Sequence, residues 1–442
     1  MRKDGHIILN NGYLRKSFII LLFSIIFFAD CKKKEAKPEE ALPKLWVTQL
    51  PAETYYCSPA LSTDEETLYI GTSTYLLGIH NKNQFFIALD TKTGKEKWRI
   101  ELGVSEVRSA PAVYSDNSIY FILEMREPAN GMVQGDELWH ISSEGDILWK
   151  YNINPGKLTI DVGLSVPAIG PDGTIYAGGD KLYAINQDGS LKWTFSGLWP
   201  EAIRNAPAIG KGGIVYFVYH NVPLTALNPE DGSVKWSLAL GEDDHCFSSP
   251  AIGTGGNIYV ATQPGIIYAV SQDGQLLWTF DIASEGFSGT FRSSPSVGSD
   301  GSIYLGLNTG NPSSAFFAIN SNGTLKWLFT PDDLPDDVPR DHFDIYSSPA
   351  IGSDGLIYFG QEFGRIYALK ATDGSMVAMT TTSNAVIWSS PVIDKNGVLY
   401  INDLNGKVHA IQTGSKGLDP SAYWPKFRYD NQNGGRTCYP CQ

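Results

Sequence analysis

The stretch ALDTKTGKEKW at residues 88–98 returns as ALNPEDGSVKW at residues 226–236. In both copies a glycine turn follows the opening Ala, and a Trp stands four residues after the Gly. The same Gly-to-Trp spacing recurs along the chain at Trp98, Trp149, Trp193, Trp236, Trp278 and Trp327. A unit that returns at a regular interval is the signature of a repeat architecture.

Each copy opens with a residue pair that ends in Pro, and a Tyr follows nine or ten residues later. The eight prolines are Pro59, Pro111, Pro167, Pro207, Pro250, Pro295, Pro349 and Pro391. Their mean spacing, (391 − 59)/7, is about 47 residues. Each period holds short β-branched and aromatic runs separated by Gly and Asp turns, which is typical of four strands per unit. The sequence therefore predicts an all-β fold, an eight-bladed β-propeller.

The N-terminal segment is predicted to close the ring. Trp46 stands thirteen residues before Pro59, as Trp98 stands thirteen before Pro111. The seventh copy has Ala378 where the others have Trp, and the eighth copy stops before a fourth strand. We therefore expect residues around Trp46 to supply the outer strand of the last blade, because closure pairs edges that would otherwise be open. The propeller then spans residues 46–414, and residues 415–442 form a tail that packs on it.

These repeats resemble the tryptophan-docking motif of pyrroloquinoline-quinone-type propellers. The resemblance covers residues 46 to about 412 and implies that one Trp per blade stacks between neighbouring blades. The docking residues would be Trp46, Trp98, Trp149, Trp193, Trp236, Trp278 and Trp327. The motif is structural and does not by itself imply a quinone.

The first thirty residues are interpreted as a bacterial lipoprotein signal peptide. Arg15 and Lys16 precede thirteen apolar or small residues, a run too short to cross a bilayer. Cys31 follows and would carry the lipid, with residues 31–45 as a polar tether. Lys32 after the Cys resembles outer-membrane sorting. The alternative is a secreted protein in which Cys31 has no special role.

Loop lengths predict that one face of the ring carries the function. The first-to-second and third-to-fourth strand turns are uniform, whereas the Tyr-to-Ala distance across the second-to-third loop ranges from 8 to 19 residues. In the second copy His140 replaces the Ala and the distance is 20. Loops placed by a rigid scaffold often carry function, although neutral drift is the alternative.

A ring of larger side chains is predicted at the channel mouth on that face, three residues before each Pro. Its candidate ligand or partner residues are Tyr56, Arg108, Arg204, Phe247, Arg292, Tyr346 and Trp388, with Leu164 as the eighth member. Guanidinium groups among aromatic rings suit an anionic or planar ligand, or an acidic partner segment. The alternative is that these residues pack between blades, with each Arg paired to a local carboxylate.

Catalytic and metal motifs are scarce. Cys438 and Cys441 predict a small terminal disulfide, with half of a metal site as the alternative. The acidic residues of the longest loop favour a solvated loop over calcium binding; they are Asp332, Asp333, Asp336, Asp337, Asp341 and Asp344. No catalytic residue and no metal ligand is assigned. Quinoproteins of the resembled superfamily carry adjacent cysteines beside the cofactor, and no two Cys are adjacent here. No cofactor is therefore expected, and pyrroloquinoline quinone with Ca²⁺ is the alternative.

Charge argues against a nucleic-acid partner. The chain carries a net charge of −13, which becomes −15 without the four basic and two acidic residues of 1–30. The leading interpretation is a monomeric, non-enzymatic scaffold of the cell envelope, lipid-anchored in the outer membrane. It resembles the propeller lipoprotein of the outer-membrane β-barrel assembly machinery and would bind a protein partner through the long-loop face. The alternatives are a quinone-dependent dehydrogenase and a surface protein that binds a small ligand or glycan.

Overall fold

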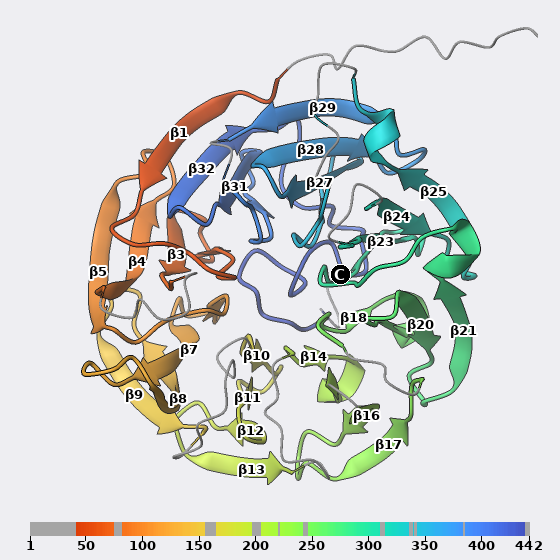
Figure 1. Cartoon of the computed structure of the whole chain (residues 1–442). Coiled ribbons are helices and arrows are strands. Elements are labelled where there is room, and N and C mark those ends of the chain that lie inside the picture. The colour runs from red at the N-terminus through yellow and green to blue at the C-terminus, as the bar shows by residue number, and fades with distance from the viewer. Residues whose placement is uncertain are drawn as a thin grey trace, which may run out of the picture. The chain divides into compact units, whose positions relative to one another are not determined.

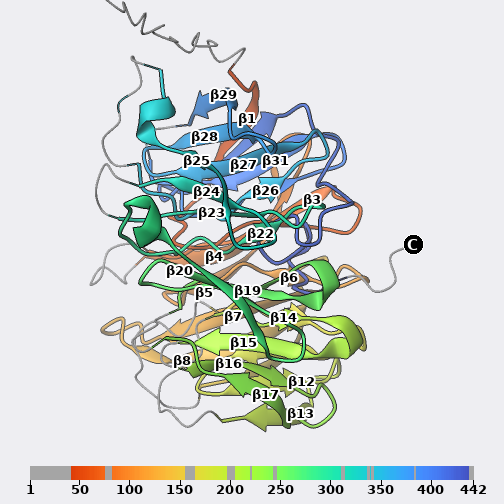
Figure 2. The same cartoon turned by 90° about the vertical axis from the view of Figure 1, so that its right-hand side faces the viewer.

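The computed structural model describes residues 41–74, 82–154, 165–196, 205–219, 222–241, 246–309, 314–335, 339, 343–382 and 385–437. These residues belong to one compact unit, Lys37–Gln442. They form eight four-stranded antiparallel sheets arranged as blades around a central axis (Figure 1). Seen from the side, the sheets lie next to one another around the ring (Figure 2). The prediction of an all-β, eight-bladed propeller is confirmed.

Each blade uses four strands, counted from the axis to the rim. Blades 1 to 4 consist of β2 (Ala60–Leu61), β3 (Thr67–Gly71), β4 (Gln84–Asp90), β5 (Glu96–Gly103); β6 (Ala112–Val113), β7 (Ile119–Arg126), β8 (Val133–Ile141), β9 (Ile147–Asn152); β10 (Ala168–Ile169), β11 (Ile175–Gly178), β12 (Leu182–Ile185), β13 (Leu191–Phe195); and β14 (Ala208–Ile209), β15 (Val215–Tyr219), β16 (Val222–Leu227), β17 (Val234–Leu238).

The other blades follow the same order, except that the last takes its outer strand from the N-terminal end. Blades 5 to 8 consist of β18 (Ala251–Ile252), β19 (Ile258–Ala261), β20 (Ile266–Val270), β21 (Leu276–Asp281); β22 (Ser296–Val297), β23 (Ile303–Gly306), β24 (Phe316–Ile319), β25 (Leu325–Phe329); β26 (Ala350–Ile351), β27 (Leu356–Gln361), β28 (Arg365–Lys370), β29 (Met376–Thr381); and β30 (Val392–Ile393), β31 (Val398–Asn402), β32 (Lys407–Gln412), β1 (Lys44–Gln49). Short 3₁₀ turns are η2 (Lys211–Gly213), η3 (Thr254–Gly256), η4 (Ile282–Glu285) and η5 (Pro331–Asp333). None of these described helical segments is long and apolar enough to cross a membrane.

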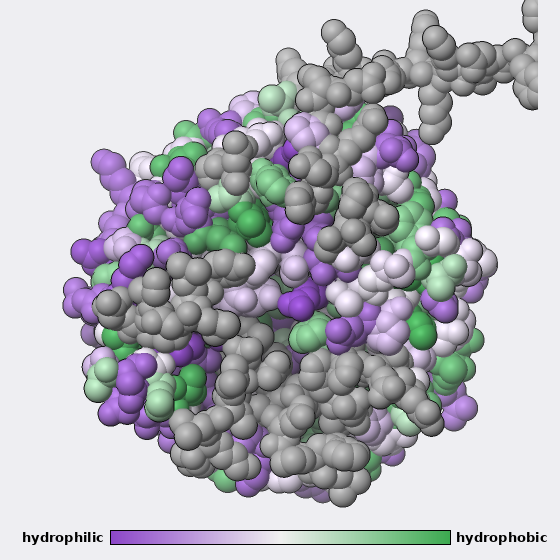
Figure 3. Space-filling model, in the orientation of Figure 1, coloured by the Kyte–Doolittle hydropathy of each residue, from purple (hydrophilic) through white to green (hydrophobic). Residues whose placement is uncertain are grey.

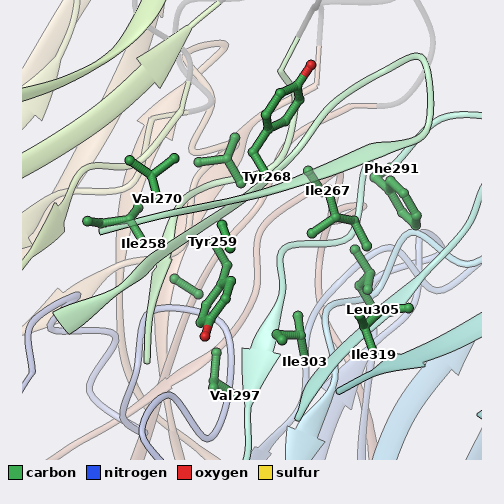
Figure 4. Packing of buried hydrophobic residues seen from close by; sticks show 14 of the residues in the cluster. Ile258, Tyr259, Ile267, Tyr268, Val270, Phe291, Val297, Ile303, Leu305 and Ile319 are labelled. Atoms are coloured by element: carbon green, nitrogen blue, oxygen red, sulfur yellow. The ribbon is translucent and has the colours of Figure 1, made fainter. Parts of the chain in front are cut away.

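Ring closure by the N-terminal strand is confirmed. Strand β1 pairs with β32 in antiparallel register, with Trp46 opposite Ala410. The apolar core between the blades is built from the buried faces of the inner strands, as Figure 4 shows for Ile258, Ile267 and Leu305.

The recurring Tyr, Ala and Trp lie side by side across six of the eight blades. In blade 5, Tyr259 pairs with Ala269, which pairs with Trp278 on the next strand. The small Ala lets the Tyr and Trp rings approach over it, and their centroids are 5.9 Å apart. In blade 2 His140 takes the place of this Ala and stacks on Tyr120, with centroids 4.3 Å apart. Burial there lowers the pKa of His140 to about 4, so this imidazole is neutral at pH 7.

Seven tryptophans join neighbouring blades. Each indole Nε1–H donates a hydrogen bond of 2.8–3.0 Å to a backbone carbonyl in the third-to-fourth strand turn of the next blade. The donor and acceptor pairs are Trp46–Thr91, Trp98–Ser143, Trp149–Gln187, Trp193–Pro229, Trp236–Gln272, Trp278–Ser321 and Trp327–Ala371. The indole lies over the turn Gly, so a Cβ added at Gly374 would come within 2.5 Å of Trp327. Gly374 also has a φ of +72°, which disfavours other residues.

The missing eighth Trp has a structural reason. A docking Trp on β29 would need the third-to-fourth strand turn of blade 8. In that blade β32 ends at Gln412 and β1 begins at Lys44, so no turn joins them. Ala378 stands at the Trp position and is buried in a hydrophobic cluster with Leu42 and Leu418 packed against it. The sequence lacks a Trp where the neighbouring blade has two separate chain segments in place of the receiving turn.

This explanation predicts that removing a docking Trp and adding one at the seventh position both destabilise the propeller. We expect Trp327→Ala to lower the free energy of unfolding by about 3–5 kcal/mol, since it empties a docked site. We expect Ala378→Trp to lower it as well, by about 1–3 kcal/mol, because the larger ring has no turn to dock on and overfills a packed site. Urea unfolding measures both values. A gain in stability from Ala378→Trp would show that blade 8 offers a docking site after all.

The C-terminal tail runs across the ring on the face of the uniform turns. Backbone N–H groups of seven innermost strands donate hydrogen bonds to tail oxygens at 2.7–3.2 Å. The donors are Leu61, Val113, Ile169, Ile209, Val297, Ile351 and Ile393, and the accepting residues are Asn431, Gln432, Gly434, Gly435, Trp424, Pro425 and Asn431 again. The tail therefore closes this face of the ring near the axis.

Polar side chains of the tail bond to the carbonyls of the blade-opening prolines. Asn433 Nδ2 donates to the carbonyls of Pro59 and Pro111, each at 3.1 Å. Arg428 donates to the carbonyls of Pro207 and Pro167, at 2.6 and 3.3 Å. These two residues alone contact four consecutive blades, and Arg428 is almost fully buried.

Lys426 organises the tail from within. Its Nζ donates to the carbonyls of Phe427 and Asp430 and to Asn433 Oδ1, at 2.5–3.0 Å. Three acceptors match the three hydrogens of an ammonium group. Burial lowers the pKa of Lys426 to about 7, and these three bonds favour its charged form.

Candidate functional site

A cavity of about 320 Å³ lies on the axis, and every blade contributes to its wall. We call this cavity the cup. Its described lining residues are Tyr55, Tyr56, Ser58, Arg108, Ser109, Ala110, Val166, Asn205, Phe247, Ser249, Arg292, Ser294, Tyr346, Ser348, Trp388, Ser390 and Phe427. In chain order the wall residues precede the innermost strands, so the cup faces the side of the long loops. Figure 3 shows a face of the ring on which hydrophilic and intermediate residues surround the centre.

Six residues of the predicted ring line the cup: Tyr56, Arg108, Phe247, Arg292, Tyr346 and Trp388. The remaining members, Arg204 and Leu164, lie outside the described residues. So do Cys31, Cys438 and Cys441, and with them the lipidation site and the terminal disulfide.

Four aromatic rings form a continuous arc on one side of the cup. Trp388 stacks on Tyr56, with centroids 4.8 Å apart and planes at 22°. Tyr55 and Tyr346 lie on the same Trp388 ring at 5.0 and 4.8 Å. Burial raises the pKa of Tyr346 to about 12, so its phenol stays protonated. Tyr56 has a φ of +63°, a conformation that is costly for a residue with a Cβ and that often marks functional positions.

Arg108 and Arg292 have different electrostatic surroundings. Arg108 is only 5% exposed and lies 3.7 Å from a Glu106 oxygen and 3.6 Å from a Glu124 oxygen. Arg126 completes this buried cluster by pairing with the same two carboxylates. Among the described residues, this cluster pairs two arginines with two glutamates. Arg108 therefore matches the alternative interpretation, in which the arginine is paired with local carboxylates.

Arg292 has no carboxylate neighbour among the described residues, unlike Arg108. No carboxylate of the described residues lies within 4.0 Å of its guanidinium. Its Nη1 donates to the Tyr56 hydroxyl at 3.1 Å, and the group stacks 4.6 Å above the Phe247 ring. These contacts join the arginine to the aromatic arc without neutralising its charge.

Five serines form a hydrogen-bonded belt one position before the blade-opening Pro. Each Oγ accepts a hydrogen bond from the backbone N–H of the matching residue in the preceding blade, at 2.8–3.2 Å. The accepting residues are Ser249, Ser294, Ser348, Ser390 and Ser58, which cover blades 5 to 8 and blade 1. The belt ties the inner strands together around more than half of the axis.

The other blades present an apolar arc, and the tail fills it. Ala110, Val166 and Ala206 take the belt position in blades 2 to 4, and Phe427 of the tail packs against them. Phe427 also lines the cup. The cup therefore has a wall from all eight blades and a floor that includes a tail side chain.

The described cysteines and two acidic-loop aspartates are buried or hydrogen-bonded within the fold. Cys57 and Cys246 are buried and belong to no disulfide, and burial raises the pKa of Cys57 to about 12, so it is not a reactive thiolate. In the acidic loop, Asp333 accepts a bond from the Thr330 backbone N–H at 2.8 Å, and Asp344 accepts one from Thr309 at 2.8 Å. Within the described parts of the chain, no group of three His, Cys, Asp or Glu side chains could hold a metal ion.

Sequence reasoning missed three contributors to the cup. The spacing rule selects Tyr56 but not its neighbour Tyr55, which contacts the same Trp388. The belt serines are visible as small residues before Pro, a feature that crowding at the axis also explains. Phe427 has no signal in the repeat, because it comes from the tail. The sequence does contain one signal for the belt: the residue before the blade-opening Pro is Ser in five copies and Ala or Val in the other three.

Taken together, these features define a closed eight-bladed β-propeller with tryptophan-docked blades and an axial cup. A family model described as "Outer membrane protein assembly factor BamB" matches residues 45–194 and 133–346. These matches cover more than half of the chain, and the chain belongs to this family.

Solved structures with low sequence identity share the fold. BamB from Moraxella catarrhalis aligns with a TM-score of 0.60 at 12% identity, over 84% of this chain and 100% of that chain. The computationally designed Ika8 protein aligns at 0.60 and 14% identity, over 85% of this chain and 100% of its own. The C-terminal WD40 domain of Sif2 gives 0.60 at 13% identity, over 85% and 99%. No curated protein matches the sequence.

Proposed function

We propose that this protein is a non-enzymatic scaffold of the bacterial cell envelope that binds a protein partner through its long-loop face. Membership of the family described as an outer-membrane protein assembly factor supports the envelope location. We further propose that Cys31 carries a lipid anchor in the outer membrane and that the propeller is monomeric.

The difference between the two faces carries the proposal. The face of the uniform turns is crossed by the tail, which bonds to seven innermost strands. The other face carries the cup and the loops of variable length. Function concentrates in loops held by a rigid scaffold, and the loops that vary in length lie on this face.

Two exposed apolar side chains on the long-loop face suit a protein partner. Met132 is 57% exposed at the β7–β8 connection, and Phe363 is 39% exposed at the β27–β28 turn. Phe363 has a φ of +57°, a backbone conformation that is energetically unfavourable for a residue with a side chain. Aromatic and Met side chains are enriched in protein interfaces.

The quinone-dependent alternative is less well supported by the cup. Ca²⁺ prefers six to eight oxygen ligands that include carboxylates. The described lining of the cup contains no Asp or Glu. These residues do not fit a calcium-bound quinone, which favours the scaffold interpretation.

Site-specific photo-crosslinking in cells tests the proposed function. A photoreactive residue at position 132 or 363 should give crosslinks to a distinct envelope protein. The matched controls are the exposed residues Glu144 and Asp188, which lie in third-to-fourth strand turns on the opposite face. Equal crosslinking from both faces, or none from positions 132 and 363, would contradict binding through the long-loop face.

A further inference from the structure

The belt leaves donor hydrogens that no described residue accepts. A Ser hydroxyl has one hydrogen to donate and two lone pairs. In the five belt serines one lone pair takes a backbone N–H, and none of their hydroxyl hydrogens has an acceptor among the described residues. All five side chains are buried and line the cup. Five O–H donors therefore border one cavity.

A second observation points to a bound group. Ser109 lines the cup, is 1% exposed, and its Oγ makes no hydrogen bond. Arg292 Nε is also buried without a hydrogen-bond partner. Buried polar atoms in native proteins are normally paired, so unpaired donors at one cavity call for an acceptor that enters it.

The lining and the volume of the cup indicate what kind of molecule would carry that acceptor. The arc of Tyr55, Tyr56, Trp388 and Tyr346 offers ring faces, and the Phe427 floor is apolar. The volume of about 320 Å³ is at the small end of the range of ligand pockets, about 300–1,000 Å³. A flat apolar group of a few carbon atoms fits these walls.

We propose that the cup binds a carboxylate group carried on a flat apolar body. The carboxylate accepts hydrogen bonds from Arg292, Ser109 and the belt, and the body lies against the aromatic arc. Among the described lining residues, Arg292 is the one arginine with no carboxylate within 4.0 Å, and a single positive charge favours a carboxylate over a phosphate dianion. Carboxylate oxygens have about four acceptor positions, which suits a site made of donors.

The carboxylate has two possible sources, a free small molecule or a side chain of the partner. The second source rests on the proposed function, because a partner's acidic residue would enter from the long-loop face. The first source does not depend on it. Both use the same donors in the cup.

Calorimetric titration of the whole protein tests the site directly. Phenylacetate should bind, and the neutral isostere phenylacetamide should bind at least tenfold more weakly, since charge-assisted hydrogen bonds are the stronger ones. Added salt should weaken phenylacetate binding. A short peptide containing Phe-Glu, compared with its Phe-Gln analogue, provides the second arm. Tighter binding of the peptide assigns the carboxylate to a partner, and tighter binding of phenylacetate assigns it to a free ligand.

Two variants and a matched control make the result specific. Arg292→Gln should weaken phenylacetate binding at least tenfold. Arg99→Gln removes a guanidinium of the outer strand β5 that lies 5.3 Å from the Phe85 ring, and it should leave binding unchanged. Ser109→Ala removes a hydroxyl that makes no hydrogen bond in the free protein. It should leave the melting temperature unchanged and weaken phenylacetate binding several-fold.

Three results would overturn the carboxylate site. They are equal binding of acid and amide, no binding of either phenylacetate or the Phe-Glu peptide at millimolar concentration, and unchanged affinity in both Arg292→Gln and Ser109→Ala. The crosslinking experiment reports separately on the proposed function. Phenylacetate binding without a crosslinked partner would support the carboxylate site and contradict the scaffold function.

Discussion

Deleting residues 418–442 is expected to lower the melting temperature of the propeller more than any single substitution. The tail accepts a hydrogen bond from each of seven innermost strands. At about 1 kcal/mol for each bond, these contribute about 7 kcal/mol. Trp424 is fully buried under the ring and adds about 3 kcal/mol. The total is comparable to the net stability of many whole domains.

Thermal unfolding followed by near-ultraviolet circular dichroism measures this effect. The matched control is a deletion of residues 438–442 alone, which removes none of the described tail contacts. We expect the control to melt with the intact chain and the long deletion to melt far below it or fail to fold. Equal melting temperatures for the two deletions would show that the ring does not depend on the tail.

Deleting residues 44–50 is expected to have the second largest effect. This change removes β1, so β32 becomes an open edge, and it removes the Trp46 bond to the Thr91 carbonyl at 2.9 Å. Blade 8 then loses both its outer strand and its docked contact with blade 1. An exposed edge strand also invites pairing between molecules.

The control for ring closure is a deletion of residues 32–40, which precede the described strand. We expect this shorter tether to leave the melting temperature unchanged, while the deletion of 44–50 lowers it and promotes aggregation. Size-exclusion chromatography and thermal melting report both effects. Similar behaviour of the two deletions would contradict the structural role of β1.

The architecture could be predicted from the sequence because one small set of residues repeats. The Pro-to-Tyr and Ala-to-Trp distances are each nine or ten residues, and each of these residues has a geometric reason in a blade. The Ala lies between the Tyr and Trp rings, and the Trp docks on a turn Gly of the next blade. Trp46 could be placed in the last blade because its distance to Pro59 equals that of Trp98 to Pro111. The blades and the ring closure could therefore be predicted from distances along the sequence alone.

The site was only partly predictable, because its chemistry depends on contacts between distant segments. The spacing rule treats Arg108 and Arg292 as equivalent. They differ because Glu106, in the β5–β6 connection, and Glu124, on β7, lie beside Arg108, whereas no carboxylate lies within 4.0 Å of Arg292 among the described residues. The path of the tail has no repeat to reveal it. Asn433 and Arg428 meet blade-opening prolines that lie more than two hundred residues earlier in the chain.

The closed floor of the cup has a kinetic consequence. Because the described part of the tail crosses the ring beneath the cup and Phe427 contributes to its floor, we expect a molecule to enter and leave the cup by the long-loop face. A partner seated on that face would cover the exit. Occupants of the cup and of the face would then exchange in a fixed sequence, last in and first out. The residence time of the inner molecule would be set by the dissociation rate of the outer one.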